Sequence, residues 1–150
     1  MPMEERGLGS RPTIPQERFD FLGYTFGRCY NQKNGRAYIS ARPSRKSIKR
    51  MVDSIIQETD RRRILLDAEY VVGRLNRKLT GWANYFNMGP VSPAYRAINA
   101  HVLTRLRRWL CAKHKVLGKG ERCYPDRYFY EKLKLVNLPK RTHDLPWAKA

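Results

Sequence analysis

Apolar residues repeat at helical spacing in three long stretches of the chain. The first stretch follows Pro43 and predicts a helix over 45–59, with Ser44 as its N-cap. The second predicts a helix over 68–87 that ends before Gly89-Pro90, and the third a helix over 93–115 that Ser92 caps. The apolar face of the second helix consists of Val72, Leu75, Leu79, Trp82 and Phe86, and that of the third of Ile98, Val102, Leu106 and Trp109. We expect both faces in one core.

The segment before these helices is rich in aromatic residues that favour β-structure. Residues 19–30 and 36–41 predict the two strands of a hairpin, with a turn signal between them at Asn31–Gly35. A lone hairpin is marginally stable in water, so it must pack on the helices. Residues 126–134 predict a short further helix. The expected fold class is therefore mainly α: a three-helix bundle preceded by a β-hairpin, with a short C-terminal helix.

The chain is strongly basic, with 31 Lys and Arg against 13 Asp and Glu and a net charge of +18. Like charges repel within a compact fold, so this excess indicates a polyanionic partner, of which nucleic acid is the commonest. No apolar run approaches the ~20 residues of a membrane span, and the N-terminus lacks the apolar region of a secretory signal. Three cysteines without paired spacing fit a reducing compartment, and we expect a cytoplasmic protein with no membrane partner.

The basic residues are concentrated on two predicted helices. Between Pro93 and Lys115 there are six Lys or Arg and no acidic residue, whereas a merely solvated helix face usually mixes both signs. The cations of both helices lie away from the apolar stripes, so bundle packing should leave them exposed. Arg side chains can form paired hydrogen bonds with phosphate, Asn side chains can form hydrogen bonds with base edges, and Tyr rings can stack on unpaired bases. The predicted RNA-binding residues are Arg74, Arg77, Lys78, Asn84, Tyr85, His101, Arg105, Arg108 and Lys115.

Other features of the sequence favour structural roles. A glycine inside a helix, such as Gly81, destabilises the helix by ~1 kcal/mol relative to alanine. Its presence is explained either by tight helix packing, the favoured interpretation, or by close approach of an RNA backbone. Cys111, His114 and Cys123 have poor spacing for a zinc site, so we expect no metal and no other cofactor. The acidic residues are scattered rather than clustered around metals, and no nucleophile motif is present. We therefore expect no enzymatic activity from this chain.

Several segments resemble group II intron maturases, which are also reverse transcriptases. Residues 19–26, FDFLGYTF, resemble the segment that closes the palm of these proteins. Residues 75–86, LNRKLTGWANYF, are similar to the signature of their maturase-specific domain, also called domain X or the thumb. Residues 105–115 and 128–133 match later segments of the family. The resemblance covers residues 18–150.

This resemblance implies binding of the protein's own intron RNA in support of folding and splicing. In full-length members the thumb also grips the template–primer duplex. The fingers, the palm and its metal-binding aspartates have no counterpart here, so we expect a truncated protein with a genuine C-terminus at 145–150. The expected organisation is a lead-in foreign to the family over 1–17, a hairpin from the end of the palm over 18–43 and the maturase-specific helical domain over 44–150.

Two other functions remain open at this point. A DNA-binding helix-turn-helix protein would need two helices joined by a short turn, and the segment around Gly89-Pro90 is compatible in length. A structural module that only docks against a polymerase body would have little RNA affinity of its own.

Overall fold

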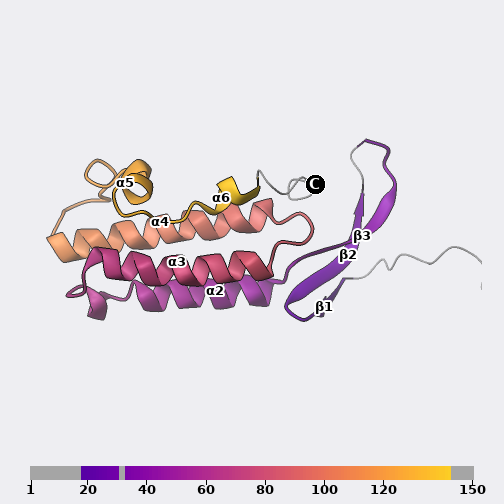
Figure 1. Ribbon diagram of the computed structural model, residues 1–150, viewed down its shortest axis with the longest axis horizontal. Helices are drawn as coiled ribbons and strands as arrows, with labels where there is room; N and C mark the ends of the chain where they lie inside the picture. The colour runs from indigo at the N-terminus through magenta and orange to yellow at the C-terminus, as the bar shows by residue number, and fades with distance from the viewer. Residues whose placement is uncertain (1–17, 31–32, 143–150) are drawn as a thin grey trace, which may run out of the picture.

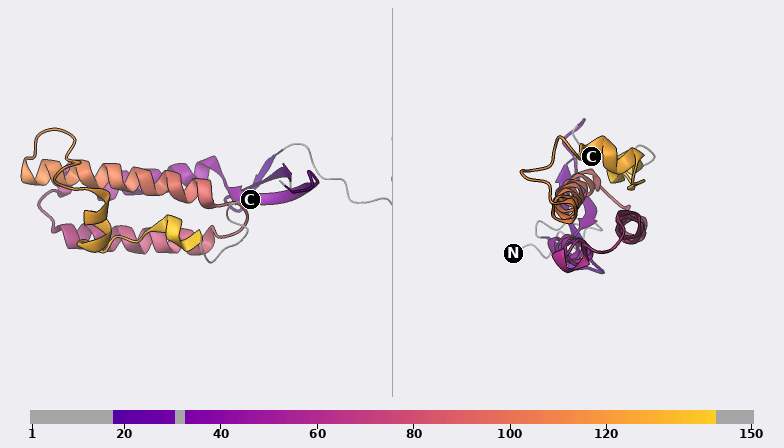
Figure 2. Two further views of the ribbon diagram at one scale, coloured as in Figure 1. Left: turned by 90° about the horizontal axis from the view of Figure 1, so that it is seen from above. Right: turned by 90° about the vertical axis from the view of Figure 1, so that its left-hand side faces the viewer.

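Three long helices lie side by side, and a small sheet projects from one end of the bundle (Figure 1). The computed structural model describes residues 18–30 and 33–142, so the predicted lead-in over 1–17 and the ending over 145–150 lie outside the described residues. The long helices are α2 (Arg45–Glu58), α3 (Ala68–Tyr85) and α4 (Ser92–His114). Seen end-on, they occupy the corners of a triangle (Figure 2). The prediction of a mainly helical fold is confirmed.

The helix boundaries follow from local chemistry. Ser44 caps α2 as predicted, because its Oγ accepts a hydrogen bond from the backbone N–H of Ser47 at 3.1 Å. The predicted cap at Ser92 is wrong: Ser92 is already helical, and Val91 takes the cap position without a side-chain hydrogen bond. The α3–α4 loop passes so close to the sheet that a Cβ on Gly89 would lie 1.8 Å from the carbonyl oxygen of Ala41. Glycine is therefore required at this position.

The predicted hairpin is present and has a third strand. The sheet is antiparallel, with β1 (Phe19–Phe21), β2 (Tyr24–Tyr30) and β3 (Ala37–Pro43) in that order. The segment predicted as one strand folds back at Leu22-Gly23, where both residues have positive φ, 53° and 85°. Two successive positive φ angles are what a tight hairpin turn needs, but leucine rarely supplies one. Gly23 is therefore the turn signal in this segment, and it is a weak one because leucine precedes it.

The core lies between the three helices. The residues of the apolar stripe predicted over 93–115 are all buried in α4. Those of the stripe predicted over 68–87 are also buried, except Trp82, which is only partly buried. Trp82 bridges two clusters, since it packs against the main core and against a small cluster of Tyr24, Ala41 and Phe86 that joins the sheet to the bundle. This second cluster is the packing partner that the hairpin needs.

The chain after α4 runs back along the bundle (Figure 1). The predicted C-terminal helix is shorter than expected, α5 (Asp126–Glu131), because Lys134 adopts a left-handed conformation with φ 61°. A second short helix, α6 (Leu138–Arg141), was not predicted; it has Pro139 in its first turn, where a missing N–H costs nothing. A 3-10 turn, η1 (Arg61–Arg63), connects α2 and α3.

Candidate nucleic-acid interface

The carboxylate of Glu58 is the centre of a charged cluster at the end of α2. Its side chain is only 2% exposed, and Arg74 donates to both of its oxygens, Nε to Oε2 at 2.8 Å and Nη2 to Oε1 at 3.0 Å. Lys78 Nζ lies 2.9 Å from Oε1, and Arg63 Nη1 lies 3.4 Å from Oε2. The hydrogen bond from Arg74 lowers the pKa of Glu58 to about 2, against the opposing effect of burial, with Lys78 adding to the lowering. Glu58 is therefore ionised at neutral pH.

Two of the three predicted cations of α3 thus face α2. The expectation that bundle packing leaves Arg74 and Lys78 exposed holds only in part, because both side chains are paired with Glu58. About a third of each side chain still reaches solvent, 36% for Arg74 and 33% for Lys78. Three cations share this one carboxylate, so the cluster keeps a positive charge at the surface.

Arg105 on α4 is also engaged within the fold. Its Nε donates to Thr59 Oγ1 at 3.2 Å and its Nη2 to the Thr59 carbonyl oxygen at 3.4 Å. These bonds tie the middle of α4 to the residue that follows α2. Like Arg74 and Lys78, this predicted site residue is less exposed than its helical position suggested.

Three predicted cations are exposed and unpaired. The side chains of Arg77 on α3, Arg108 on α4 and Lys115 after α4 make no hydrogen bond or ion pair within residues 18–30 and 33–142. Lys115 takes the left-handed conformation that ends α4, with φ 55°. These side chains can contact phosphate without breaking an internal bond.

Asn84 and Tyr85 lie at the exposed C-terminal end of α3 but have internal partners. Arg141 Nη2 donates to Asn84 Oδ1 at 2.6 Å, which ties α6 to α3. The Tyr85 hydroxyl donates to the carbonyl oxygen of Leu22 at 2.7 Å. The Tyr85 ring remains 53% exposed, so its face is open to contact from outside.

His101 on α4 is half-buried beside two arginines. Burial lowers the pKa of His101, and the charges of Arg105 and Arg108 lower it further. The ring is therefore neutral at neutral pH and adds no charge to the basic surface. Its Nε2 is buried without a hydrogen-bond partner among the described residues.

The outer side of α3 carries two glycines that do not pack against another helix. A Cβ on Gly73 or Gly81 would meet no atom within 4 Å, so the packing interpretation of Gly81 is wrong. Their spacing of four residues from Arg77 puts both glycines on its side of the helix, near Tyr70, which is 52% exposed. This ridge, formed by Tyr70, Gly73, Arg77 and Gly81, allows an external backbone to approach the helix closely. The spacing itself is visible in the sequence.

No metal site is formed within the described ranges. No group of three or more His, Cys, Asp or Glu side chains there is placed to hold an ion. Cys111 is buried and Cys123 exposed, both as free thiols. None of the described helices is long and apolar enough to cross a membrane.

Comparison with known families identifies a match over most of the helical region. A family model described as the group II intron, maturase-specific domain matches residues 48–129, which run from α2 through α5. Arg74, Arg77, Arg108 and Lys115 all fall inside the matched range. No curated protein matches the chain.

Proposed function

The chain belongs to the family of group II intron maturase-specific domains, and we propose that it binds group II intron RNA through the exposed cations of α3 and α4. Membership of this family supports a maturase role in splicing. The observation that carries RNA binding is the exposure of Arg77, Arg108 and Lys115 without internal partners in the described part of the chain, together with a net charge of +18. We propose no catalytic step for the chain.

The physical basis is the release of counterions from RNA phosphates. Each phosphate contact contributes about 0.7–0.9 to the slope of log affinity against log salt. The three unpaired cations alone would give a slope of about −2 to −3 by this rule. Arg74 and Lys78 can add to this slope through the third of each side chain that is exposed, while Glu58 fixes their positions. Exposed Tyr70 and Tyr85 supply ring faces for unpaired bases.

The test is RNA binding by the whole chain at several salt concentrations. A folded group II intron should outcompete an unstructured RNA of equal length at ~0.2 M salt, where non-specific attraction weakens. Replacing both Arg77 and Arg108 with Ala should flatten the salt slope by about one to two units. The matched control replaces both with Lys, which keeps the charge and should keep the slope.

Two outcomes would contradict the proposal. A slope that does not change in the double Ala variant would remove the exposed arginines from the interface. A changed slope without preference for the folded intron would leave a general polyanion binder. The template–primer duplex implied by the resemblance offers the same phosphate chemistry, so it belongs in the same competition series.

The structure does not favour the helix-turn-helix alternative. In that motif two helices cross at ~90–120°, whereas α3 and α4 run alongside each other (Figure 1). The docking alternative has one observation in its favour, since Phe19, Phe21 and Leu22 at the edge of the sheet are 50%, 60% and 69% exposed. A docking module without RNA affinity would show no salt-dependent binding in the experiment above.

A further inference from the structure

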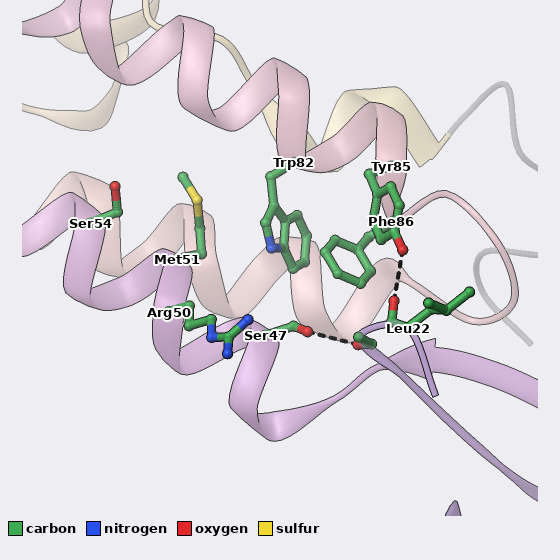
Figure 3. A pocket seen from close by; sticks show the side chains of 9 residues that line it. Leu22, Ser47, Arg50, Met51, Ser54, Trp82, Tyr85 and Phe86 are labelled. Atoms are coloured by element: carbon green, nitrogen blue, oxygen red, sulfur yellow. Dashed lines mark hydrogen bonds between the residues drawn. The ribbon is translucent and has the colours of Figure 1, made fainter. Parts of the chain in front are cut away.

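A pocket of about 510 Å³ lies where α2, α3 and the Leu22-Gly23 turn meet (Figure 3). Its volume falls within the ~300–1,000 Å³ typical of sites for small organic groups. The aromatic residues at the end of α3 form one side of it, and Arg50 and Met51 of α2 form the other. Of the residues predicted to contact RNA, Tyr85 alone lines it.

The walls of the pocket are fixed by internal hydrogen bonds. Ser47 Oγ donates to the carbonyl oxygen of Gly23 at 2.7 Å, and the Tyr85 hydroxyl donates to that of Leu22 at 2.7 Å. Both bonds appear as dashed lines in Figure 3. On α2, Ser54 Oγ accepts from Lys78 Nζ at 2.8 Å. The pocket is therefore preformed, which reduces the entropy that a ligand must offset on binding.

Aromatic rings dominate one wall. The ring centroids of Trp82 and Phe86 are 4.7 Å apart, and those of Tyr85 and Phe86 are 4.6 Å apart. Trp82 is only partly buried although it packs against both apolar clusters. The rings are inclined to one another, by 38° for Trp82 and Phe86 and by 81° for Tyr85 and Phe86, so they form no single flat wall, and a planar ligand would stack on one ring.

Two polar side-chain groups of the pocket have no internal partner within residues 18–30 and 33–142, and both are hydrogen-bond donors. Trp82 Nε1 is buried without a partner among the described residues, and in Figure 3 its nitrogen edge is turned toward the Met51 and Arg50 side. The Arg50 side chain is exposed and makes no hydrogen bond or ion pair in the described part of the chain. No carboxylate among the described residues lines the pocket. An occupant with acceptor atoms and negative charge complements this set, whereas an apolar protein side chain would leave Nε1–H unpaired.

We propose that this pocket receives one unstacked base of the bound RNA. The base stacks on the partly exposed ring of Trp82, beside the edge of the buried Phe86, and its acceptor edge faces the donors of Trp82 and Arg50. A nucleotide combines the planar ring, the acceptors and the negative charge that the pocket complements. This inference rests on the proposed RNA binding and adds to it a contact that reads a base rather than phosphate.

The test compares two decamers with the same number of phosphates, oligouridylate and an abasic RNA backbone, in binding to the whole chain. We expect the decamer with bases to bind about tenfold tighter, as one stacked base contributes on this scale. Trp82→Phe keeps a ring but removes the N–H, and Arg50→Ala removes the cation; each should reduce the ratio at least about threefold. Arg96→Ala, an exposed charge of α4 outside the pocket, should weaken both decamers equally and preserve the ratio.

Each contrary result has a separate meaning. Equal binding of both decamers, with salt dependence intact, overturns the base pocket and leaves the proposed function standing. A large ratio that neither variant reduces places the base contact elsewhere and also overturns it. Absence of binding by either decamer or by intron RNA overturns both proposals. Arg50 is exposed, so Arg50→Ala still tests the pocket even if Trp82→Phe lowers stability.

Discussion

Arg74 on α3 donates two hydrogen bonds, at 2.8 and 3.0 Å, to the buried carboxylate of Glu58 on α2. This pair joins two helices of the bundle and also fixes the position of a predicted RNA contact. If the proposed RNA contact of Arg74 exists, Glu58 contributes both to the stability of the bundle and to that contact.

Glu58→Gln should destabilise the fold by about 2 kcal/mol at neutral pH. Breaking a fully buried ion pair costs ~3–5 kcal/mol, and solvent around the partly exposed Arg74 and Lys78 reduces that cost. Urea unfolding measures the change. Asp53→Asn is the control, because its exposed pair with Lys49 should contribute no more than ~0.5 kcal/mol. Equal effects of the two substitutions would contradict a central role for Glu58.

Lowering the pH should reduce the stability of the fold, because the carboxylate of Glu58 becomes protonated. The pKa of Glu58 is lowered from 4.5 to about 2, mainly by the hydrogen bond from Arg74. A lowered folded-state pKa gives stability that is present above about pH 4.5 and is lost as the pH falls through about 2. We expect a loss of about 1–2 kcal/mol in this window after solvent screening. In Glu58→Gln that part of the pH dependence should disappear, as unfolding curves from about pH 5 to about pH 2 would show.

Trp82 and Trp109 should differ in their contribution to stability. Trp109 is 2% exposed and lies in the main core, so Trp109→Ala should cost ~3–5 kcal/mol, a large part of the ~5–15 available to a small domain. Trp82 is only partly buried and lines an open pocket, so Trp82→Ala should cost less. Thermal melting of both variants gives the order. A larger loss for Trp82→Ala would show that it supports the core more than Trp109 does.

Two glycines should respond to alanine in opposite directions. Gly81→Ala should stabilise α3 by about 0.5–1 kcal/mol, because the new Cβ meets no atom within 4 Å and alanine favours helix. The same change should weaken intron RNA binding if an RNA backbone approaches the ridge closely. Gly89→Ala should destabilise, since the Cβ would clash with the Ala41 carbonyl oxygen and φ is +70°. Melting and RNA titration together test both effects, and unchanged RNA affinity in Gly81→Ala would remove the ridge from the interface.

The sequence by itself determined the three long helices, most of the core between them and the family. Local signals such as the Ser44 cap and the Gly89-Pro90 stop act within a few residues, so they can be read without knowing the neighbours. The stripe through Leu79 and the stripe through Leu106 identified the buried faces, because helical periodicity relates each residue to its own helix. The 75–86 signature lies within the range that matches the family model.

Only the tertiary structure decided which cations are free. The helical periodicity separates Arg77 from the apolar stripe, but it cannot reveal that Glu58, on another helix, forms ion pairs with Arg74 and Lys78. The Leu22-Gly23 turn and the pocket beside it depend in the same way on contacts between distant segments, such as that of Ser47 with Gly23. Such contacts are set by how elements pack in space, whereas the pattern along the chain records only each element's own periodicity.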